Sequence, residues 1–121
     1  MTVLTALWLS LAAWSKAPAF PARLEAALVH AESRGVPWVK NGPCMGLWQV
    51  NYRFASPLVR RYPVLLYLPP IGQAEGRLAL AYWRRQCRGR MRCALAAYTC
   101  GWSGVRGTCG GAYADGILAR K

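Results

Sequence analysis

Short helical segments bounded by proline and glycine place the strongest constraint on how this chain can fold. The clearest covers residues 21–34, where apolar side chains recur at helical spacing at Leu24, Leu28 and Ala31. Pro21 suits the first turn of a helix, because its missing N–H would have no partner there. Gly35-Val36-Pro37 ends the helix, since glycine accepts a left-handed cap and proline moves its predecessor out of helical geometry.

The rest of the chain predicts further short helices joined by irregular segments. Residues 36–44 contain two prolines and Gly42, which predicts a loop with room for a short hairpin, and residues 45–50 form a second short ordered segment. Prolines make residues 53–71 an irregular stretch with short helices. Helices are expected over residues 73–86, with Leu78 and Tyr82 facing inward, over 91–98 and over 112–120, with a glycine-rich loop at 101–111. Strand alternation is weak, so the fold class is mainly α.

The first twenty residues allow two interpretations. Residues 2–14 are apolar, but about thirteen residues are too few for an ordinary membrane span. They resemble the apolar part of a secretory signal, and Ala17-Pro18-Ala19 offers small residues for cleavage. However, no Lys or Arg precedes them, and Pro18 lies close to the expected cut. Residues 1–20 are therefore a signal-like segment or a first helix, and residues 21–121 are the single domain that this length supports.

The charge of the chain points to an anionic partner. Sixteen Lys and Arg face four Asp and Glu, for a net charge of +12. Nucleic acid, anionic lipid and the bacterial cell wall all meet this condition. The densest basic run, Arg84 to Arg92, is interpreted as a solvated face that attracts the protein to an anionic wall. Nucleic acid is not expected as a partner, because no recognised binding motif accompanies the run.

Five cysteines are many for a chain of this size. No CxxC pair occurs and His30 stands alone, so no metal site is expected, and no cofactor is implied. Disulfides formed in an oxidising compartment are the better interpretation. Closeness in sequence favours Cys100 with Cys109 and Cys87 with Cys93, which leaves one thiol over.

Glu32 is the candidate catalytic residue. It lies in the last turn of the predicted 21–34 helix, where backbone carbonyls make the local potential negative. Partial burial beside Leu28 would disfavour the charged carboxylate further, and both effects raise its pKa. A general acid that protonates a glycosidic oxygen needs such a carboxyl, still protonated near neutral pH. The alternative is an ordinary glutamate on a solvated helix face.

Three motifs in order favour the catalytic interpretation. They are Glu32-Ser33, then Gly46-Leu47-Trp48-Gln49-Val50-Asn51, then Ala97-Tyr98-Thr99-Cys100-Gly101 followed by Gly104-Val105. Together they resemble the soluble lytic transglycosylase family of the lysozyme-like superfamily, over residues 21 to about 106. That family has Glu-Ser at a helix end, Gly-Leu-Met-Gln, and Ala-Tyr-Asn-x-Gly before a Gly-Val. The resemblance implies a lysozyme-like α fold with a small loop or hairpin lobe and a deep cleft for a glycan strand.

The resemblance also implies a reaction. Glu32 would protonate the linkage between N-acetylmuramic acid and N-acetylglucosamine in peptidoglycan, and then act as base while the C6 hydroxyl of the sugar attacks. The product would be a 1,6-anhydro sugar. Substrate-binding roles carry over by position to Ser33, Gly46, Gln49, Asn51, Tyr98 and Thr99.

Individual expectations follow for these positions. Gln49 and Asn51 would hydrogen-bond the sugars, Gly46 would let the backbone approach the glycan, and Tyr98 would place its hydroxyl near Glu32. Ser33 would position Glu32 or cap the turn. Trp48 stands where the family usually has Met, and Thr99 where it usually has Asn, so Thr99 offers a hydroxyl in place of the amide. Trp38 and Trp102 are candidate stacking platforms for sugars. Cysteines beside two motifs, Cys44 and Cys100, suggest loops pinned by disulfides.

The resemblance implies peptidoglycan strands and the anionic wall as partners of a monomer. It implies export to the periplasm or the cell exterior, with phage lysis or entry, or local wall opening for a secretion machine, as settings. Two rival functions stay open. One is a lysozyme-type hydrolase of the same bond, and the other is a non-catalytic cationic protein that binds the wall or disrupts membranes.

Overall fold

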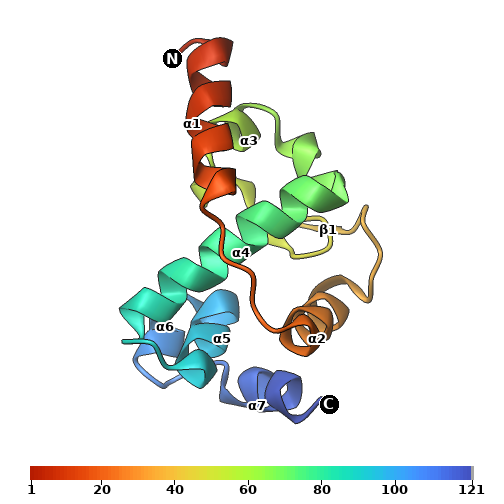
Figure 1. Ribbon diagram of the computed structural model, residues 1–121. Helices are drawn as coiled ribbons and strands as arrows, with labels where there is room; N and C mark the ends of the chain where they lie inside the picture. The colour runs from red at the N-terminus through yellow and green to blue at the C-terminus, as the bar shows by residue number, and fades with distance from the viewer. Residues whose placement is uncertain (121) are drawn as a thin grey trace.

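Seven α-helices carry most of residues 1–120, the part of the chain that the computed structural model describes (Figure 1). In chain order they are α1 Val3–Ser15, α2 Ala22–Ser33, α3 Pro57–Arg61, α4 Pro69–Gln86, α5 Met91–Cys100, α6 Trp102–Val105 and α7 Gly111–Ala119. Two 3-10 helices, η1 Tyr52–Phe54 and η2 Pro63–Tyr67, lie on either side of α3. The mainly α, lysozyme-like class is confirmed.

A small antiparallel sheet forms the second lobe. Its strands are β1 Lys40–Asn41, β2 Cys44–Met45 and β3 Val50–Asn51, in the order β1-β2-β3. Lys40 lies opposite Met45, and Cys44 lies opposite Asn51. The hairpin that glycine and proline indicated is therefore present, and a third strand extends it toward η1.

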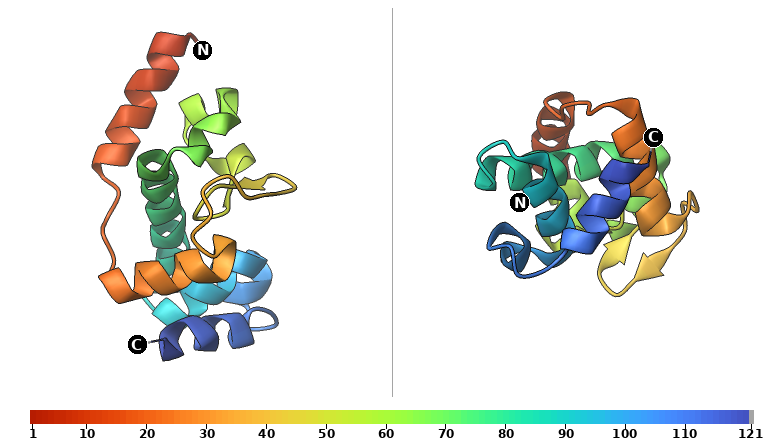
Figure 2. Two further views of the ribbon diagram at one scale, coloured as in Figure 1. Left: turned by 90° about the vertical axis from the view of Figure 1, so that its right-hand side faces the viewer. Right: turned by 90° about the horizontal axis from the view of Figure 1, so that it is seen from below.

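Helix α4 runs through the middle of the molecule (Figure 2). It packs most extensively on α5, and α1, α3 and η2 lie toward its first turns, while α6 and α7 lie beside α5. It begins at Pro69 rather than near residue 73. Pro69 and Pro70 occupy its first turn, where a backbone N–H has no partner within the helix, so the N–H that proline lacks is not missed. The loop expected at 101–111 is also partly helical, since it contains α6.

Trp48 lies at the centre of the core. Its side chain is 2% exposed, beside the fully buried Leu28, Leu80 and Leu95. Gly76 of α4 makes room for it, since a Cβ at that position would come within 2.4 Å of the indole ring. The tryptophan that replaces the usual Met is thus accommodated by a glycine on the facing helix.

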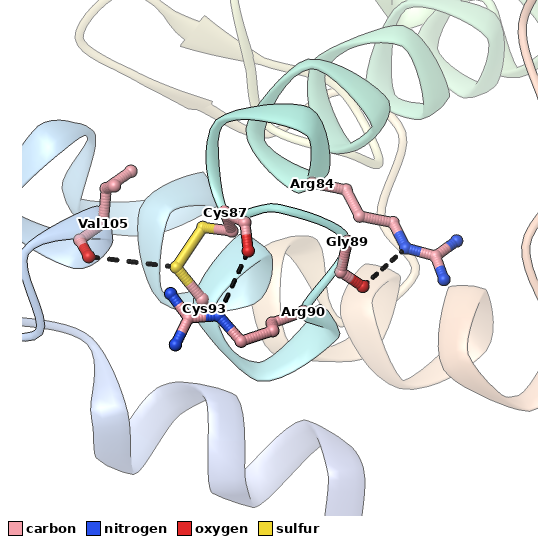
Figure 3. The surroundings of a disulfide bond; sticks show 6 residues. All are labelled: Arg84, Cys87, Gly89, Arg90, Cys93 and Val105. Atoms are coloured by element: carbon pink, nitrogen blue, oxygen red, sulfur yellow. Dashed lines mark hydrogen bonds between the residues drawn. A yellow bond between two sulfur atoms is a disulfide. The ribbon is translucent and has the colours of Figure 1, made fainter.

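The two disulfides pair as sequence closeness suggested. Cys87–Cys93 joins the end of α4 to α5, and Cys100–Cys109 joins the end of α5 to the segment before α7. Around the first bond, Arg84 donates to the carbonyl of Gly89 and Arg90 to that of Cys87, both at 3.1 Å (Figure 3). Cys44 carries a free thiol. The expectation that a disulfide pins the Cys44 loop is therefore wrong, and hydrogen bonds described below hold it instead.

The N-terminal segment is the helix α1, and it packs against α3 and α4. Ser10 is fully buried, and its Oγ accepts a hydrogen bond from the backbone N–H of Leu58 at 2.9 Å. Trp14 donates its indole N–H to Glu75 at 2.7 Å. Within residues 1–120, no helix has the length and apolar character needed to cross a membrane.

Candidate active site

The end of α2 holds Glu32 in a closed turn. Arg34 adopts the left-handed conformation, with φ at +54°, and its N–H donates to the carbonyl of His30 at 3.0 Å. The buried Ser33 donates from Oγ to the carbonyl of Val29 at 3.1 Å and accepts from the N–H of Gly35 at 3.3 Å. Ser33 therefore caps the helix end directly beside Glu32, which is half-buried.

Two tyrosines lie near the Glu32 carboxyl, and only one was expected. Tyr113 of α7 donates its hydroxyl hydrogen bond to Oε1 of Glu32. Tyr98 of α5 instead donates to the carbonyl of Trp48 at 2.5 Å, although the charge of Glu32 acts on it. Sequence reasoning missed Tyr113. The sequence shows only a tyrosine in the predicted 112–120 helix, and the neighbouring Ala114 proves to be buried; a hydroxyl brought toward a core needs an acceptor.

The surroundings of Glu32 favour its protonated form. Burial raises its pKa above the ordinary value, and the hydrogen bond from Tyr113 acts in the opposite direction without reversing that shift. Burial and the charge of Glu32 raise the pKa values of Cys44, Tyr98 and Tyr113. Both tyrosines therefore stay protonated donors while Glu32 titrates. A carboxyl in this setting can serve as a general acid.

A cavity of about 850 Å³ lies next to this cluster. Residues of β3, η1, α4, α5 and α6 line it. Glu32 is not among the lining residues. Cys44 and Tyr98 do line it, and the charge of Glu32 raises the pKa of both.

Four of the six expected substrate-binding residues line the cavity, namely Gln49, Asn51, Tyr98 and Thr99. Thr99 is exposed on its wall, and the side chain of Asn51 accepts a hydrogen bond from the N–H of Arg53 at 3.0 Å, which caps η1. Ser33 and Gly46 are buried outside the lining. Direct contact of these residues with a sugar stays a prediction.

Gln49 and Gly46 organise the loop that Cys44 begins. Gln49 Nε2 donates to the carbonyls of Val39 and Gly46 at 3.0 Å each, and its Oε1 accepts from Asn41 Nδ2 at 3.0 Å. Gly46 has φ at +83°, and a Cβ there would lie 2.2 Å from the Leu66 carbonyl oxygen. The loop therefore needs glycine at residue 46 for its packing on η2.

Three exposed aromatic side chains line the cavity. They are Phe54 at 84% exposure, Trp102 at 48% and Tyr82 at 40%. Trp83 stands edge-on to both Tyr82 and Trp102, at centroid distances of 5.0 and 5.4 Å. The expectation that Leu78 and Tyr82 face inward is wrong, because both line the cavity, while Glu75, Gly76 and Leu80 form the buried side of α4. Phe54 had no sequence signal, and Trp38 is exposed away from the cavity.

The other three acids are held by donors. Arg77 donates to the two carboxyl oxygens of Glu25 at 2.7 and 2.8 Å. Burial raises the pKa of Glu25, but the hydrogen bonds from Arg77 and from the N–H of Phe20 keep it below its ordinary value. The Arg92 hydrogen bond lowers the pKa of Asp115. Glu75 accepts hydrogen bonds from Trp14 and from the backbone of Ser56. Within residues 1–120, no three His, Cys, Asp or Glu residues come together as a metal site.

A family comparison agrees with this geometry. The family model described as "Transglycosylase SLT domain" matches residues 10–119. The chain belongs to the transglycosylase SLT family. SLT domains cleave glycosidic bonds in peptidoglycan, so at the level of the family this protein is a lytic transglycosylase-type domain that binds peptidoglycan. The SLT match includes Glu32, Tyr113 and the whole cavity lining. No curated protein and no solved structure gives a significant match.

Proposed function

We propose that this SLT domain cleaves the β-1,4 linkage between N-acetylmuramic acid and N-acetylglucosamine and leaves a 1,6-anhydro end. The observation that carries the proposal is the half-buried Glu32, whose pKa burial raises and whose charge acts on Cys44 and Tyr98 in the wall of a cavity of about 850 Å³. The aromatic faces of Phe54, Tyr82 and Trp102 suit the C–H faces of sugars bound along that cavity.

The proposed reaction needs one carboxyl. Glu32 gives its proton to the glycosidic oxygen as the bond from that oxygen to C1 of the muramic acid breaks. The resulting carboxylate takes the proton of the C6 hydroxyl, whose oxygen bonds to C1. No water is consumed, and Glu32 ends protonated. The Tyr113 hydroxyl, which donates to Oε1, stabilises the carboxylate between the two transfers.

Within residues 1–120, Glu75 is the one acid that lines the cavity, and its bonding supports a mechanism without a second carboxylate. It is 3% exposed. Its Oε2 accepts from Trp14 at 2.7 Å, and the N–H of Ser56 lies 3.1 and 3.2 Å from its two oxygens. A carboxylate held by these donors fastens α1 and the Ser56 segment to α4. A nucleophile from the substrate itself removes the need for Glu75 in the reaction.

Two measurements test the proposal. Glu32→Gln should lower turnover of purified peptidoglycan by about 10²–10⁴-fold, the usual contribution of a positioned general acid. Asp115→Asn, the same change at an exposed acid, should keep its activity. A Glu32→Gln variant that clears more than a few per cent as fast as the parent would refute the assignment. Mass spectrometry of the products decides the reaction, since an anhydro end lacks one water relative to the reducing end that a lysozyme-type hydrolase leaves.

The proposal extends to the setting of the enzyme. It acts as a monomer on glycan strands in the periplasm or outside the cell, in phage lysis or entry or in local wall opening for a secretion machine. The arginines of the run Arg84 to Arg92 are exposed, and two of them surround the Cys87–Cys93 turn (Figure 3). A solvated basic face of this kind supports attraction to an anionic wall.

A further inference from the structure

Helix α1 carries an apolar stripe on the side that faces away from the protein. Leu4, Trp8 and Leu11 lie at helical spacing and are 70%, 73% and 46% exposed. The opposite side of the helix holds Ala6 and Ser10, which are buried. The helix is therefore apolar on both faces, and only one of them is covered.

The arrangement of the molecule leaves this outer face open. Figures 1 and 2 show α1 at one end of the molecule, with other elements packed on one side of it only. Met1, Val3 and Leu9 widen the apolar surface, at 72%, 40% and 47% exposure. A contiguous apolar surface of this kind marks an interaction site.

Positive charge lies at both ends of α1. No charged side chain occurs between Met1 and Lys16, and Lys16 follows directly at the end of the helix. At the other end, Arg61 of α3 donates to the carbonyl of Met1 at 3.0 Å, and its neighbour Arg60 is exposed. The acid nearest to α1 in its contacts is Glu75, which is buried.

We infer that the outer face of α1 lies on an anionic lipid surface as an interfacial helix. Thirteen residues give a helix about 20 Å long, too short for a hydrocarbon core of about 30 Å, so the helix rests on the membrane without crossing it. Leu4, Trp8 and Leu11 enter the boundary between headgroups and acyl chains, while Lys16, Arg60 and Arg61 meet anionic headgroups.

The charge of the chain decides between lipid and a second copy as the occupant. Two chains of +12 that meet through α1 would bring like charges together, which opposes association. An anionic membrane neutralises the same charges. The family match begins only at residue 10, so the stripe extends beyond the matched domain, and lipid binding is a property added to the proposed catalysis.

Sedimentation of the full chain with lipid vesicles tests the inference. Vesicles of phosphatidylglycerol and phosphatidylcholine in equal parts should bind the protein, and vesicles of phosphatidylcholine alone should bind it far less. Trp8→Ser should weaken binding by about tenfold or more, since the variant lacks the large apolar side chain that leaves water when the parent binds. Trp38→Ser is the matched control, because Trp38 is also 73% exposed but lies outside α1, and it should bind as the parent does.

Several outcomes would overturn the inference. They are no binding to the anionic vesicles, equal binding to both kinds, or equal loss in the two tryptophan variants. A concentration-dependent dimer that Trp8→Ser abolishes, without vesicle binding, would assign the face to a second copy. A secreted protein that begins after residue 19 would remove the helix altogether. Glu32→Gln should bind vesicles as the parent does, so failure of the catalytic proposal leaves this one standing.

Discussion

Replacing Tyr113 by phenylalanine removes the one hydrogen bond that the structure shows on the Glu32 carboxyl. As Glu32 gives up its proton, negative charge develops on its oxygens in a half-buried site. A hydrogen bond to a charged group contributes about 1.5–3 kcal/mol, which corresponds to a rate loss of about 10- to 150-fold if it is realised in the transition state. Tyr113→Phe should therefore lower the maximum rate by roughly that factor.

The same change should move the pH profile in a definite direction. Activity requires protonated Glu32, so it falls as pH rises through the pKa of this group. The Tyr113 hydrogen bond lowers that pKa, and without it the pKa rises further, so the alkaline limb should move to higher pH. The expected result is a lower maximum rate together with an alkaline limb that lies at higher pH than in the parent.

The assay is the rate of anhydromuropeptide release across a pH series. Tyr62→Phe is the control, because Tyr62 is exposed between α3 and η2, and it should leave both the maximum and the limb unchanged. An unchanged maximum in Tyr113→Phe, or an alkaline limb displaced to lower pH, would refute the role given to this hydroxyl.

The remaining predictions concern charge, disulfides and the Gly46 loop. Activity on whole sacculi should fall as salt rises, since exposed charges are screened beyond about 8 Å at physiological ionic strength, while cleavage of a short neutral glycan should change little; equal sensitivity would leave the arginine face as merely solvated. Alkylation without reductant should label one thiol, Cys44. Reduction should lower the free energy of unfolding by about 2–5 kcal/mol per bond, and with it both the melting temperature and the activity. Five labelled thiols would contradict this. Gly42→Ala should lower the free energy of unfolding by about 1–2 kcal/mol, because its backbone is left-handed although the space around it is open. Gly46→Ala should lower it clearly more in urea unfolding, because its Cβ would also meet the Leu66 carbonyl. Equal losses would refute the packing argument.

Features set by neighbours in the sequence could be predicted. The end of α2 follows from Gly35-Val36-Pro37, which places Glu32 in a last helical turn. Both disulfides join cysteines six and nine residues apart, so chain closeness alone selects the pairs. Such features depend on local geometry, and the tertiary fold does not reverse them.

Features set by packing between distant elements could not be predicted. Tyr113 meets Glu32 across 81 residues, through the contact of α2 with α7. The motif predicts an amide at Gln49, but its hydrogen bonds to Asn41 and Val39 depend on how the folded loop brings these residues together. Tyr82 is read as core from its helical spacing, but the cavity lies on that side of α4.

The four acids have different hydrogen-bond partners, and this difference explains how so basic a chain keeps Glu32 as a proton donor. Arginine holds Glu25 and Asp115 in the ionised form, with pKa values below the ordinary range, and neutral donors hold Glu75 between α1, Ser56 and α4. Glu32 has a neutral phenol as its partner, and burial raises its pKa. With thirteen arginines available, a guanidinium at Glu32 would have lowered that pKa and removed the proton that a general acid must carry. Within residues 1–120 no arginine pairs with Glu32, and the absence of that partner is as much a part of the site as the residues that touch it.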